Sequence, residues 1–318
     1  MESKRETHQS GLRQSTLKDS VAVRGIGLHT GRRVEMAIEP APADSGIVFE
    51  RSDLPGKPCV AARPGAVVRS ALCTALQNNG TRVSTVEHVL AALYGMGVDN
   101  ARVVLSAEEV PILDGSALPF VRLLQEGGVR SLDACRSWLR VVKPVTFSEG
   151  DRTFRILPAR RLSIECTVDF DHPLVTDQQK KYEHDPDDFQ REIAPARTFG
   201  FLKDVGEMQR AGLVRGGSLD NAVVIDSFSI LNPGGLRFPD EFVRHKVLDI
   251  LGDLALLGGA LAARVEAFKS GHRLHHAVVR RLVRDPDSCV KVQVQPNERE
   301  KDLPFDLAPF RLPGLQRA

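Results

Sequence analysis

The clearest pattern of apolar and polar positions lies between residues 241 and 257. A Pro-Gly-Gly segment precedes this pattern, and two acidic residues, Asp240 and Glu241, stand at its start, which is typical of a helix N-terminus. Residues three and four apart share a helical face, so His245, Asp249 and Asp253 lie together. The other faces are apolar: Phe242, Val247, Leu248, Ile250, Leu251, Leu254, Leu256 and Leu257. The pattern predicts a buried helix over residues 241–253 with one polar face.

Shorter patterns predict two series of strands and helices along the chain. The first series comprises strands Val21–Arg24, Arg33–Ile38, Ile47–Glu50 and Asn100–Leu105, a helix Thr85–Tyr94 capped by Ser84 or Thr85, and a helix Ala117–Gln125. The second comprises strands Leu139–Val145, Thr153–Leu157, Leu162–Val168, Ala222–Ile225 and Arg264–Phe268, a partly helical Arg197–Arg210, the long helix, and a helix Leu274–Val283. A polar stretch, Asp177–Asp188, has no predicted element.

Each series places strands before helices, and a break in composition near residues 133–137 separates the two. We therefore predict an α+β fold of two similar domains. The boundaries are a disordered N-terminal extension at 1–15, a first domain at 16–134, a second domain at 135–300 and a C-terminal tail at 301–318.

Composition narrows the class of protein. The chain has 318 residues, 42% hydrophobic and 26% charged, and a net charge of +2, so no basic footprint for nucleic acid is present. No apolar run reaches the roughly 18 residues that a membrane span needs, and the polar N-terminus lacks a signal-peptide core. Five scattered cysteines form no CxxC pair, which indicates a reducing, cytoplasmic setting without disulfides.

Candidate metal ligands come from two predicted helices. His245 and Asp249, one turn apart, can hold one divalent ion, and His88 would complete a set of two histidines and one carboxylate. Glu87 would then lie beside the open position of a catalytic zinc, where a carboxylate takes a proton from water. The same residues also suit a solvated helix face, and the same ligand set suits a non-haem iron oxygenase.

A further histidine follows a strand directly. His272, on a glycine turn, can project into a cleft as a general acid or lie in a surface loop. His275 and His276, in the following helix, are expected at the surface. The segment Arg197–Phe201 offers a hydroxyl, aromatic rings and a glycine, which suits sugar binding or a core phenylalanine pair equally well.

Several motifs together resemble one known family. They are Gly27-Leu-His-Thr-Gly31, Ser84-Thr-Val-Glu-His88, Pro111-Ile-Leu-Asp-Gly-Ser116, Ala196-Arg-Thr-Phe-Gly-Phe201, Gly235-Leu-Arg-Phe238, Phe242-Val-Arg-His-Lys246 and Lys269-Ser-Gly-His272. In this order they resemble the UDP-3-O-acyl-N-acetylglucosamine deacetylase (LpxC) family, the zinc amidases of lipid A biosynthesis. The resemblance runs from about Thr16 to His276. It implies two domains, each a sheet with packed helices, with the helices sandwiched between the two sheets.

The resemblance also implies roles for individual residues. Zinc, or Fe²⁺ in its place, would be held by His88, His245 and Asp249. The catalytic roles would be Glu87 as general base, His272 as the cation that protonates the leaving amine, Asp253 as the carboxylate that orients it, and Thr198 as an oxyanion donor. Substrate contacts would be Phe199 and Lys246 near the glucosamine and nucleotide, Lys269 at the diphosphate, and Asp169 and Phe170 near the uracil. The segment Phe201–Ala222 would contain an insert that forms a passage for the acyl chain.

The implied reaction removes the N-acetyl group of UDP-3-O-(hydroxyacyl)-N-acetylglucosamine and gives a free amine and acetate. We expect a cytoplasmic monomer that contacts the membrane surface only transiently. A non-haem iron enzyme and a non-catalytic UDP-sugar binder are the alternatives. The binder would have no use for Glu87 or His272, and both are present.

Overall fold

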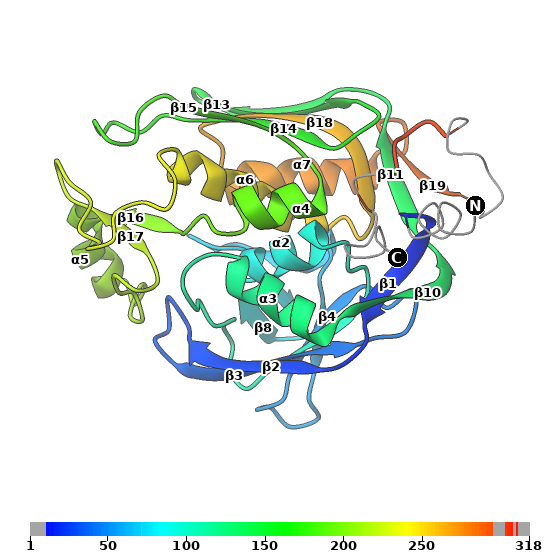
Figure 1. The fold of residues 1–318 in the computed structure, drawn as a ribbon, viewed down its shortest axis with the longest axis horizontal. Helices are drawn as coiled ribbons and strands as arrows, with labels where there is room; N and C mark the ends of the chain where they lie inside the picture. Colours follow the sequence, from blue (N-terminus) through cyan, green and yellow to red (C-terminus); the bar gives the residue numbers. More distant parts are fainter. Residues whose placement is uncertain (1–10, 71, 295–302, 308–309, 311–318) are drawn as a thin grey trace.

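The computed structural model describes residues 11–70, 72–294, 303–307 and 310. Two sheets form the outer layers of the molecule, and helices fill the space between them (Figure 1). This arrangement confirms the predicted α+β class with its helices between two sheets. None of the described helices is long and apolar enough to span a membrane.

The first sheet is built from the N-terminal part of the chain. Its order is β2 (Val21–Ile26), β3 (Arg33–Pro40), β9 (Ala101–Leu105), β4 (Ile47–Arg51) and β5 (Cys59–Ala61). A smaller sheet of β6 (Val67–Val68), β7 (Ala75–Asn78) and β8 (Thr81–Ser84) follows the 3₁₀ turn η1 (Pro64–Ala66). Strand β3 alternates buried Val34, Met36 and Ile38 with exposed Arg33 and Glu35. The apolar face packs towards helices α2 (Glu87–Gly95) and α3 (Leu118–Gly127).

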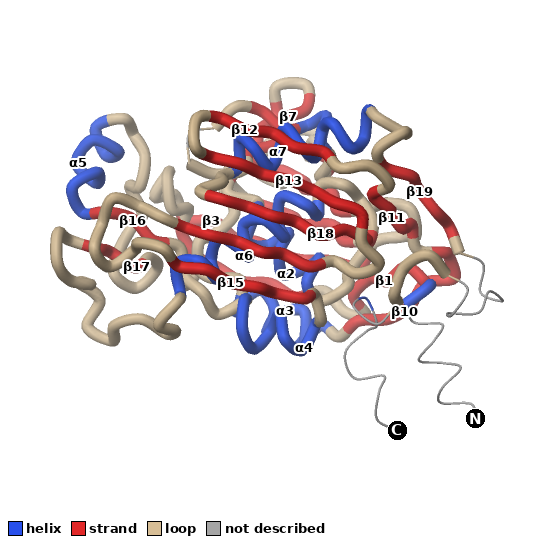
Figure 2. The backbone as a smooth tube through the Cα atoms, turned by 90° about the horizontal axis from the view of Figure 1, so that it is seen from above, coloured by secondary structure: helices blue, strands red, loops and turns tan. Residues whose placement is uncertain are grey.

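The second sheet has seven strands and covers the opposite side of the helices (Figure 2). Its path is β12 (Val145–Glu149), β13 (Arg152–Pro158), β18 (Ala260–Phe268), β11 (Ser137–Val141) and β19 (Cys289–Gln293), and β14 (Ser163–Val168) joins β15 (Gln178–Glu183) to β18. Helices α6 (Glu241–Ala255) and α7 (His272–Arg284) lie beneath it, with the short α4 (Pro186–Asp188) and η2 (Phe189–Ile193) nearby. Helix α6 is the long helix that the apolar pattern predicts.

Three local predictions need correction. The single strand predicted over 139–145 is two strands, β11 and β12, because Pro144 interrupts the pairing. The polar stretch 177–188 contains β15, which pairs only with β14 among the described strands and exposes Gln179 and Lys181 as an edge strand can. Neither Ser84 nor Thr85 caps α2; the Thr85 hydroxyl donates to Glu109 Oε1 at 2.8 Å instead.

Both ends of the described chain pack against the body. Strand β1 (Arg13–Leu17) pairs with β10 (Val129–Cys135), so residues 13–15 of the extension predicted at 1–15 belong to a strand. Leu12 is buried as well, and residues 1–10 lie outside the described residues. In the tail predicted at 301–318, the side chains of Leu303, Phe305, Leu307 and Phe310 are buried. Phe305 stacks on Trp138 with ring centroids 4.3 Å apart. The domain limits 16–134 and 135–300 stay a prediction.

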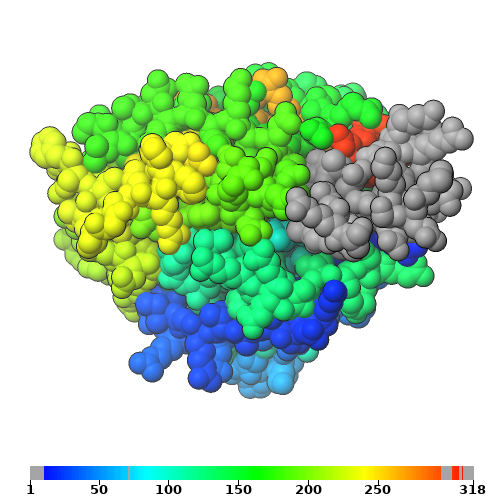
Figure 3. Space-filling view, in the orientation of Figure 1, coloured from blue at the N-terminus to red at the C-terminus, as the bar shows by residue number. Residues whose placement is uncertain are grey.

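The segment 199–225 projects from one end of the layers (Figure 3). It consists of β16 (Phe199–Phe201), helix α5 (Leu202–Arg210) and β17 (Val223–Ile225), which pairs in parallel with β16. No residue of α5 is buried. The returning chain is tied to the glycine loop of the first half, because the Arg215 N–H donates to the carbonyl of His29 at 3.2 Å.

Candidate metal centre and active site

Helices α2 and α6 cross closely because Gly252 has no side chain. A Cβ atom there would lie 2.1 Å from the carbonyl oxygen of Glu87, so a larger residue would force the helices apart. The close approach brings Glu87 and His88 of α2 against the polar face of α6. The sequence pattern predicts the polar positions on each helix. The close crossing that brings these positions together depends on Gly252.

His88, His245 and Asp249 form a cluster at the crossing. Asp249 Oδ1 lies 3.4 Å from His245 Nε2 and 3.9 Å from His88 Nε2, and the three candidate ligand atoms lie within 4.8 Å of one another. All three side chains are buried. These separations exceed the usual N–H···O distance of about 3.2 Å or less. The three candidate ligand atoms, two imidazole nitrogens and one carboxylate oxygen, therefore lie close together without being hydrogen-bonded to each other.

The protonation of this cluster suits metal binding. Burial and the neighbouring His245 lower the pKa of His88 to about 3, and burial lowers the pKa of His245. Both imidazoles are neutral near pH 7, and the bond from His245 Nδ1 to the carbonyl of Ala196, 3.1 Å, leaves its Nε2 lone pair towards Asp249. Burial alone would raise the pKa of Asp249, but Lys246, 2.8 Å from Oδ2, outweighs it and the net shift is downward. Two neutral imidazoles and one carboxylate fit a zinc or similar divalent ion.

Glu87 and His272 flank the metal cluster. Glu87 Oε1 lies 3.8 Å from His272 Nε2, and Glu87 Oε2 accepts the Thr74 N–H at 3.0 Å. Burial raises the pKa of Glu87 to about 8. For His272, burial alone would lower the pKa, but the charge and hydrogen bond of Asp253 raise it to about 9. A carboxylate and a cationic imidazole at this distance can act as base and acid on one substrate.

Asp253 is surrounded by three histidines. Its Oδ2 lies 2.7 Å from His272 Nδ1 and 2.8 Å from His275 Nδ1, and its Oδ1 lies 3.1 Å from His276 Nε2. The surface position expected for His275 and His276 is wrong, because both are buried. They follow His272 by three and four residues, so they share its helical face and point towards α6. That spacing was visible in the sequence.

Thr198 lies on a segment that is anchored from both sides. Its backbone N–H donates to the carbonyl of Gly115 at 2.8 Å. The preceding residue, Arg197, forms an ion pair with Glu241, with Nε 2.8 Å from Oε1, and the Glu241 side chain is fully buried. Burial would raise the pKa of Glu241, but the hydrogen bonds and charge of Arg197 give a net lowering. Glu241 therefore anchors the segment of Thr198 at the start of α6, a role that sequence reasoning missed.

The five residues predicted to contact substrate form one connected strip. Lys269 Nζ lies 2.9 Å from Asp169 Oδ2. The next residue, Phe170, packs edge-on against Phe199 at 5.7 Å between ring centroids, and Lys246 Nζ lies 5.8 Å from the Phe199 ring centroid. Because Lys246 also bonds to Asp249, the strip runs from the metal cluster to the half-buried Lys269 and the exposed Phe170.

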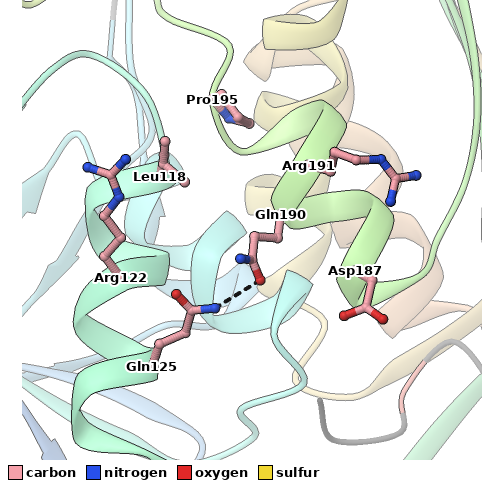
Figure 4. Close-up of a pocket in the computed structure, with 7 residues that line it drawn as sticks. All are labelled: Leu118, Arg122, Gln125, Asp187, Gln190, Arg191 and Pro195. Atoms are coloured by element: carbon pink, nitrogen blue, oxygen red, sulfur yellow. Dashed lines mark hydrogen bonds between the residues drawn. The ribbon is translucent and has the colours of Figure 1, made fainter. Parts of the chain in front are cut away.

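A separate cavity of about 480 Å³ lies between α3 and the α4–η2 segment (Figure 4). Its lining residues are Leu118, Arg122, Gln125, Asp187, Gln190, Arg191 and Pro195. Gln125 and Gln190 meet across it through a 2.9 Å hydrogen bond. None of the residues of the metal cluster or of the strip lines this cavity.

Comparisons with known proteins point to one family. The family model for UDP-3-O-acyl N-acetylglycosamine deacetylase (LpxC) matches residues 14–284. The UDP-3-O-acyl-N-acetylglucosamine deacetylase of Anaeromyxobacter sp. (strain Fw109-5) is 53% identical over 279 residues, which cover 88% of this chain and 91% of that protein. The proteins of the same name from Myxococcus xanthus and Saccharophagus degradans are 48% and 43% identical, over 89% and 90% of this chain and 90% and 95% of their own lengths. The chain therefore belongs to the UDP-3-O-acyl-N-acetylglucosamine deacetylase family.

Proposed function

We propose that this chain is a zinc-dependent amidase that removes the N-acetyl group from UDP-3-O-(hydroxyacyl)-N-acetylglucosamine in lipid A biosynthesis. The products are the free amine and acetate. One observation carries the proposal: Glu87 Oε1 and His272 Nε2 lie 3.8 Å apart beside a cluster of two histidines and one aspartate. Membership of a family named for this deacetylation supports the substrate.

The metal ligands in this proposal are His88, His245 and Asp249. When bound, the ion supplies Lewis-acid activation of a water molecule and of the amide carbonyl. Zinc is the ion we propose, because neutral imidazoles with one carboxylate are common in catalytic zinc sites. Fe²⁺ accepts the same donors and is the alternative. Metal analysis of protein purified from cells grown in defined media would distinguish the two.

Two side chains, Glu87 and His272, carry out the proton transfers in this proposal. Glu87 takes a proton from the attacking water, and a nearby dication would keep this carboxylate ionised although burial raises its pKa to about 8. The Thr198 hydroxyl donates a hydrogen bond to the developing oxyanion. His272 then gives its proton to the amide nitrogen as the C–N bond breaks, and acetate and the amine leave. Asp253 keeps His272 cationic until that step.

The connected strip is the proposed binding surface for the nucleotide sugar. Phe199 and Lys246 lie next to the metal cluster and would contact the glucosamine and the nucleotide side. Lys269, at the outer end, would bind the diphosphate, with Asp169 and Phe170 beside the uracil. The insert within Phe201–Ala222 would provide the acyl passage, and the absence of buried residues along α5 leaves its apolar side free for a lipid chain.

We also propose that the enzyme works in the cytoplasm as a monomer that touches the membrane surface transiently. The five cysteines are free, which agrees with a reducing compartment. Light scattering on the purified protein would test the oligomeric state.

The experiment that tests the function measures release of free amine from the proposed substrate. Chelation should abolish release, and zinc should restore it. A protein that binds metal and UDP but releases no amine would instead be a non-catalytic binder. Activity that requires oxygen would indicate a non-haem iron enzyme.

A further inference from the structure

Thr74 contacts both groups that move protons in the proposed reaction. It lies just before β7 and is fully buried. Its backbone N–H donates to Glu87 Oε2 at 3.0 Å, and its hydroxyl oxygen lies 2.5 Å from Asp253 Oδ1 and 3.2 Å from His272 Nδ1. Nothing in the sequence around Thr74 marks it, because the contact arises only when the loop before β7 meets α2 and α6.

The donors around Asp253 can be assigned from chemistry alone. The pKa of Asp253 lies well below its usual range, because its hydrogen bonds and the nearby imidazoles outweigh the opposing effect of burial. An ionised carboxylate only accepts, so Thr74 must donate its single hydroxyl proton to Oδ1. The N–H of His276 is then shared between two acceptors, the Thr74 oxygen at 3.0 Å from Nε2 and Asp253 Oδ1 at 3.1 Å.

The other carboxylate oxygen is assigned in the same way. His275 Nδ1–H donates to Oδ2, and its Nε2, 2.9 Å from Ser270 Oγ, accepts the serine proton. His272 Nδ1–H donates to the same Oδ2. Asp253 thus serves four donors, from His272, His275, His276 and Thr74. The negative charge that His272 experiences depends on the other three.

We propose that the Thr74 hydroxyl is a positioning group for proton transfer, sharing the Asp253 carboxylate with His272 and so limiting how tightly His272 holds its proton. This proposal rests on the proposed deacetylase function. A hydrogen bond donated to a carboxylate stabilises its charge and makes it a weaker base. The hydroxyl therefore tunes the acid, and the N–H of the same residue orients the base.

The groups that face His272 define what a test must hold constant. They are Asp249 and Asp253 on α6, Glu87 on α2, and His275 and His276 on its own helix, with the imidazoles of His88 and His245 farther off. Thr74→Val changes none of them. Valine matches threonine in shape and keeps the N–H that binds Glu87, so the substitution removes only the hydroxyl. The hydroxyl bond to Asp253, 2.5 Å, is much shorter than its 3.2 Å contact with His272 Nδ1, so loss of the Asp253 bond sets the expected direction.

The test is the pH profile of kcat for zinc-loaded Thr74→Val enzyme. Without the hydroxyl, Asp253 holds the His272 proton more tightly, so the alkaline limb should move up by roughly 0.5–1 pH unit. kcat at neutral pH should fall by roughly two- to threefold, because a weaker acid protonates the amine more slowly and the rate follows only part of the change in pKa. KM should stay within about twofold, since Thr74 touches no proposed substrate contact. Thr74→Ser, which returns the hydroxyl, should restore both the limb and kcat.

Thr16→Val provides the matched control. Thr16 is also fully buried, and its hydroxyl accepts the Ala41 N–H at 2.9 Å. It lies on β1, in the two-stranded sheet with β10, and forms no hydrogen bond with the described residues of the metal cluster. The Thr16→Val substitution should leave the pH profile of kcat unchanged. If Thr74→Val fails to fold or to bind zinc, Thr74→Ala takes its place with the same expected shift.

Two results would overturn the proposal: a folded, zinc-loaded hydroxyl-free variant with the wild-type alkaline limb, or a serine variant that does not recover. Wild-type protein that releases no amine would instead refute the proposed function.

Discussion

Two clusters of histidine and aspartate lie one turn apart on the same helix and differ in almost every physical respect. Around Asp249, imidazole nitrogens stand 3.4 and 3.9 Å from the carboxylate, and the pKa values of both histidines are lowered, chiefly by burial. Around Asp253, nitrogens approach to 2.7–3.1 Å, and the pKa of His272 is raised to about 9 in spite of burial. The same residue types thus offer lone pairs in one cluster and protons in the other.

The difference teaches that residue type alone does not define a metal site. At Asp249, Lys246 occupies one carboxylate oxygen and leaves Oδ1 facing two neutral imidazoles. At Asp253, direct hydrogen bonds occupy both oxygens, so an ion would have to displace protons that the carboxylate stabilises. Although Asp253, His272 and His275 are also close enough together to hold an ion, we therefore propose metal binding at the first cluster and proton storage at the second.

The largest expected effect comes from Glu87, which lies between the two clusters. Glu87→Ala should reduce kcat by roughly 10²–10⁴-fold, because no other described carboxylate is placed to take the proton from water. The metal ligands are untouched, so zinc content should stay at one per chain. Steady-state kinetics with metal analysis would check both. Near-normal turnover would remove Glu87 from the mechanism.

The second-largest expected effect is a shift in the pH profile of activity, which tests the cluster around Asp253. In the proposed mechanism His272 acts as a cation, and its pKa is raised from 6.5 to about 9, so activity should fall as the pH rises through about 9. Asp253→Asn removes the charge that raises this pKa and leaves burial, which lowers it. The alkaline limb should then move towards acid by roughly 1–3 pH units. An unmoved limb in the Asp253→Asn enzyme would mean that another group sets it.

Zinc should stabilise the wild-type fold through the Asp249 cluster alone. At free zinc about 100 times the Kd, the free energy of unfolding should rise by about 2.7 kcal/mol. His245→Ala should abolish most of this gain. His275→Ala, in the other cluster, should keep it although its own stability is lower. Denaturant unfolding with and without zinc would measure the gain, and a loss of it in His275→Ala would contradict the assignment.

The smallest expected effect concerns Ser270. Ser270→Ala leaves the buried His275 Nε2 without its donor and should cost about 1 kcal/mol of unfolding free energy. The alkaline limb should stay in place, since Asp253 still binds His272 directly. Urea unfolding and a pH profile would measure the two quantities. A displaced limb would show that Ser270 acts on His272 through the chain of hydrogen bonds.

Parts of the molecule with a strong local pattern could be predicted from the sequence. The long apolar run predicts α6 within two residues of its observed end, and the three- and four-residue spacing places His245, Asp249 and Asp253 on one face. Strand β15 escaped prediction because an edge strand needs few apolar residues. Pro144 marked the break between β11 and β12, but the apolar run around it concealed the break.

The site was predictable only where its residues carry a motif or a helical spacing. The two clusters share one helix face, so their separation into metal ligands and proton carriers depends on distances that no spacing gives. His275 and His276 could have been placed beside His272 from their spacing alone. Thr74 and Gly252 act through tertiary contacts, and neither has a local signature.

The most direct test of this division is the zinc content of two matched variants, Asp249→Asn and Asp253→Asn, after dialysis against a weak chelator. Both replace a buried carboxylate by an amide of the same shape, four residues apart on α6. We expect about one zinc per chain in Asp253→Asn, as in wild type, and almost none in Asp249→Asn, because of the two carboxylates we propose only Asp249 as a ligand. Zinc retained by Asp249→Asn and lost by Asp253→Asn would reverse the assignment of the two clusters.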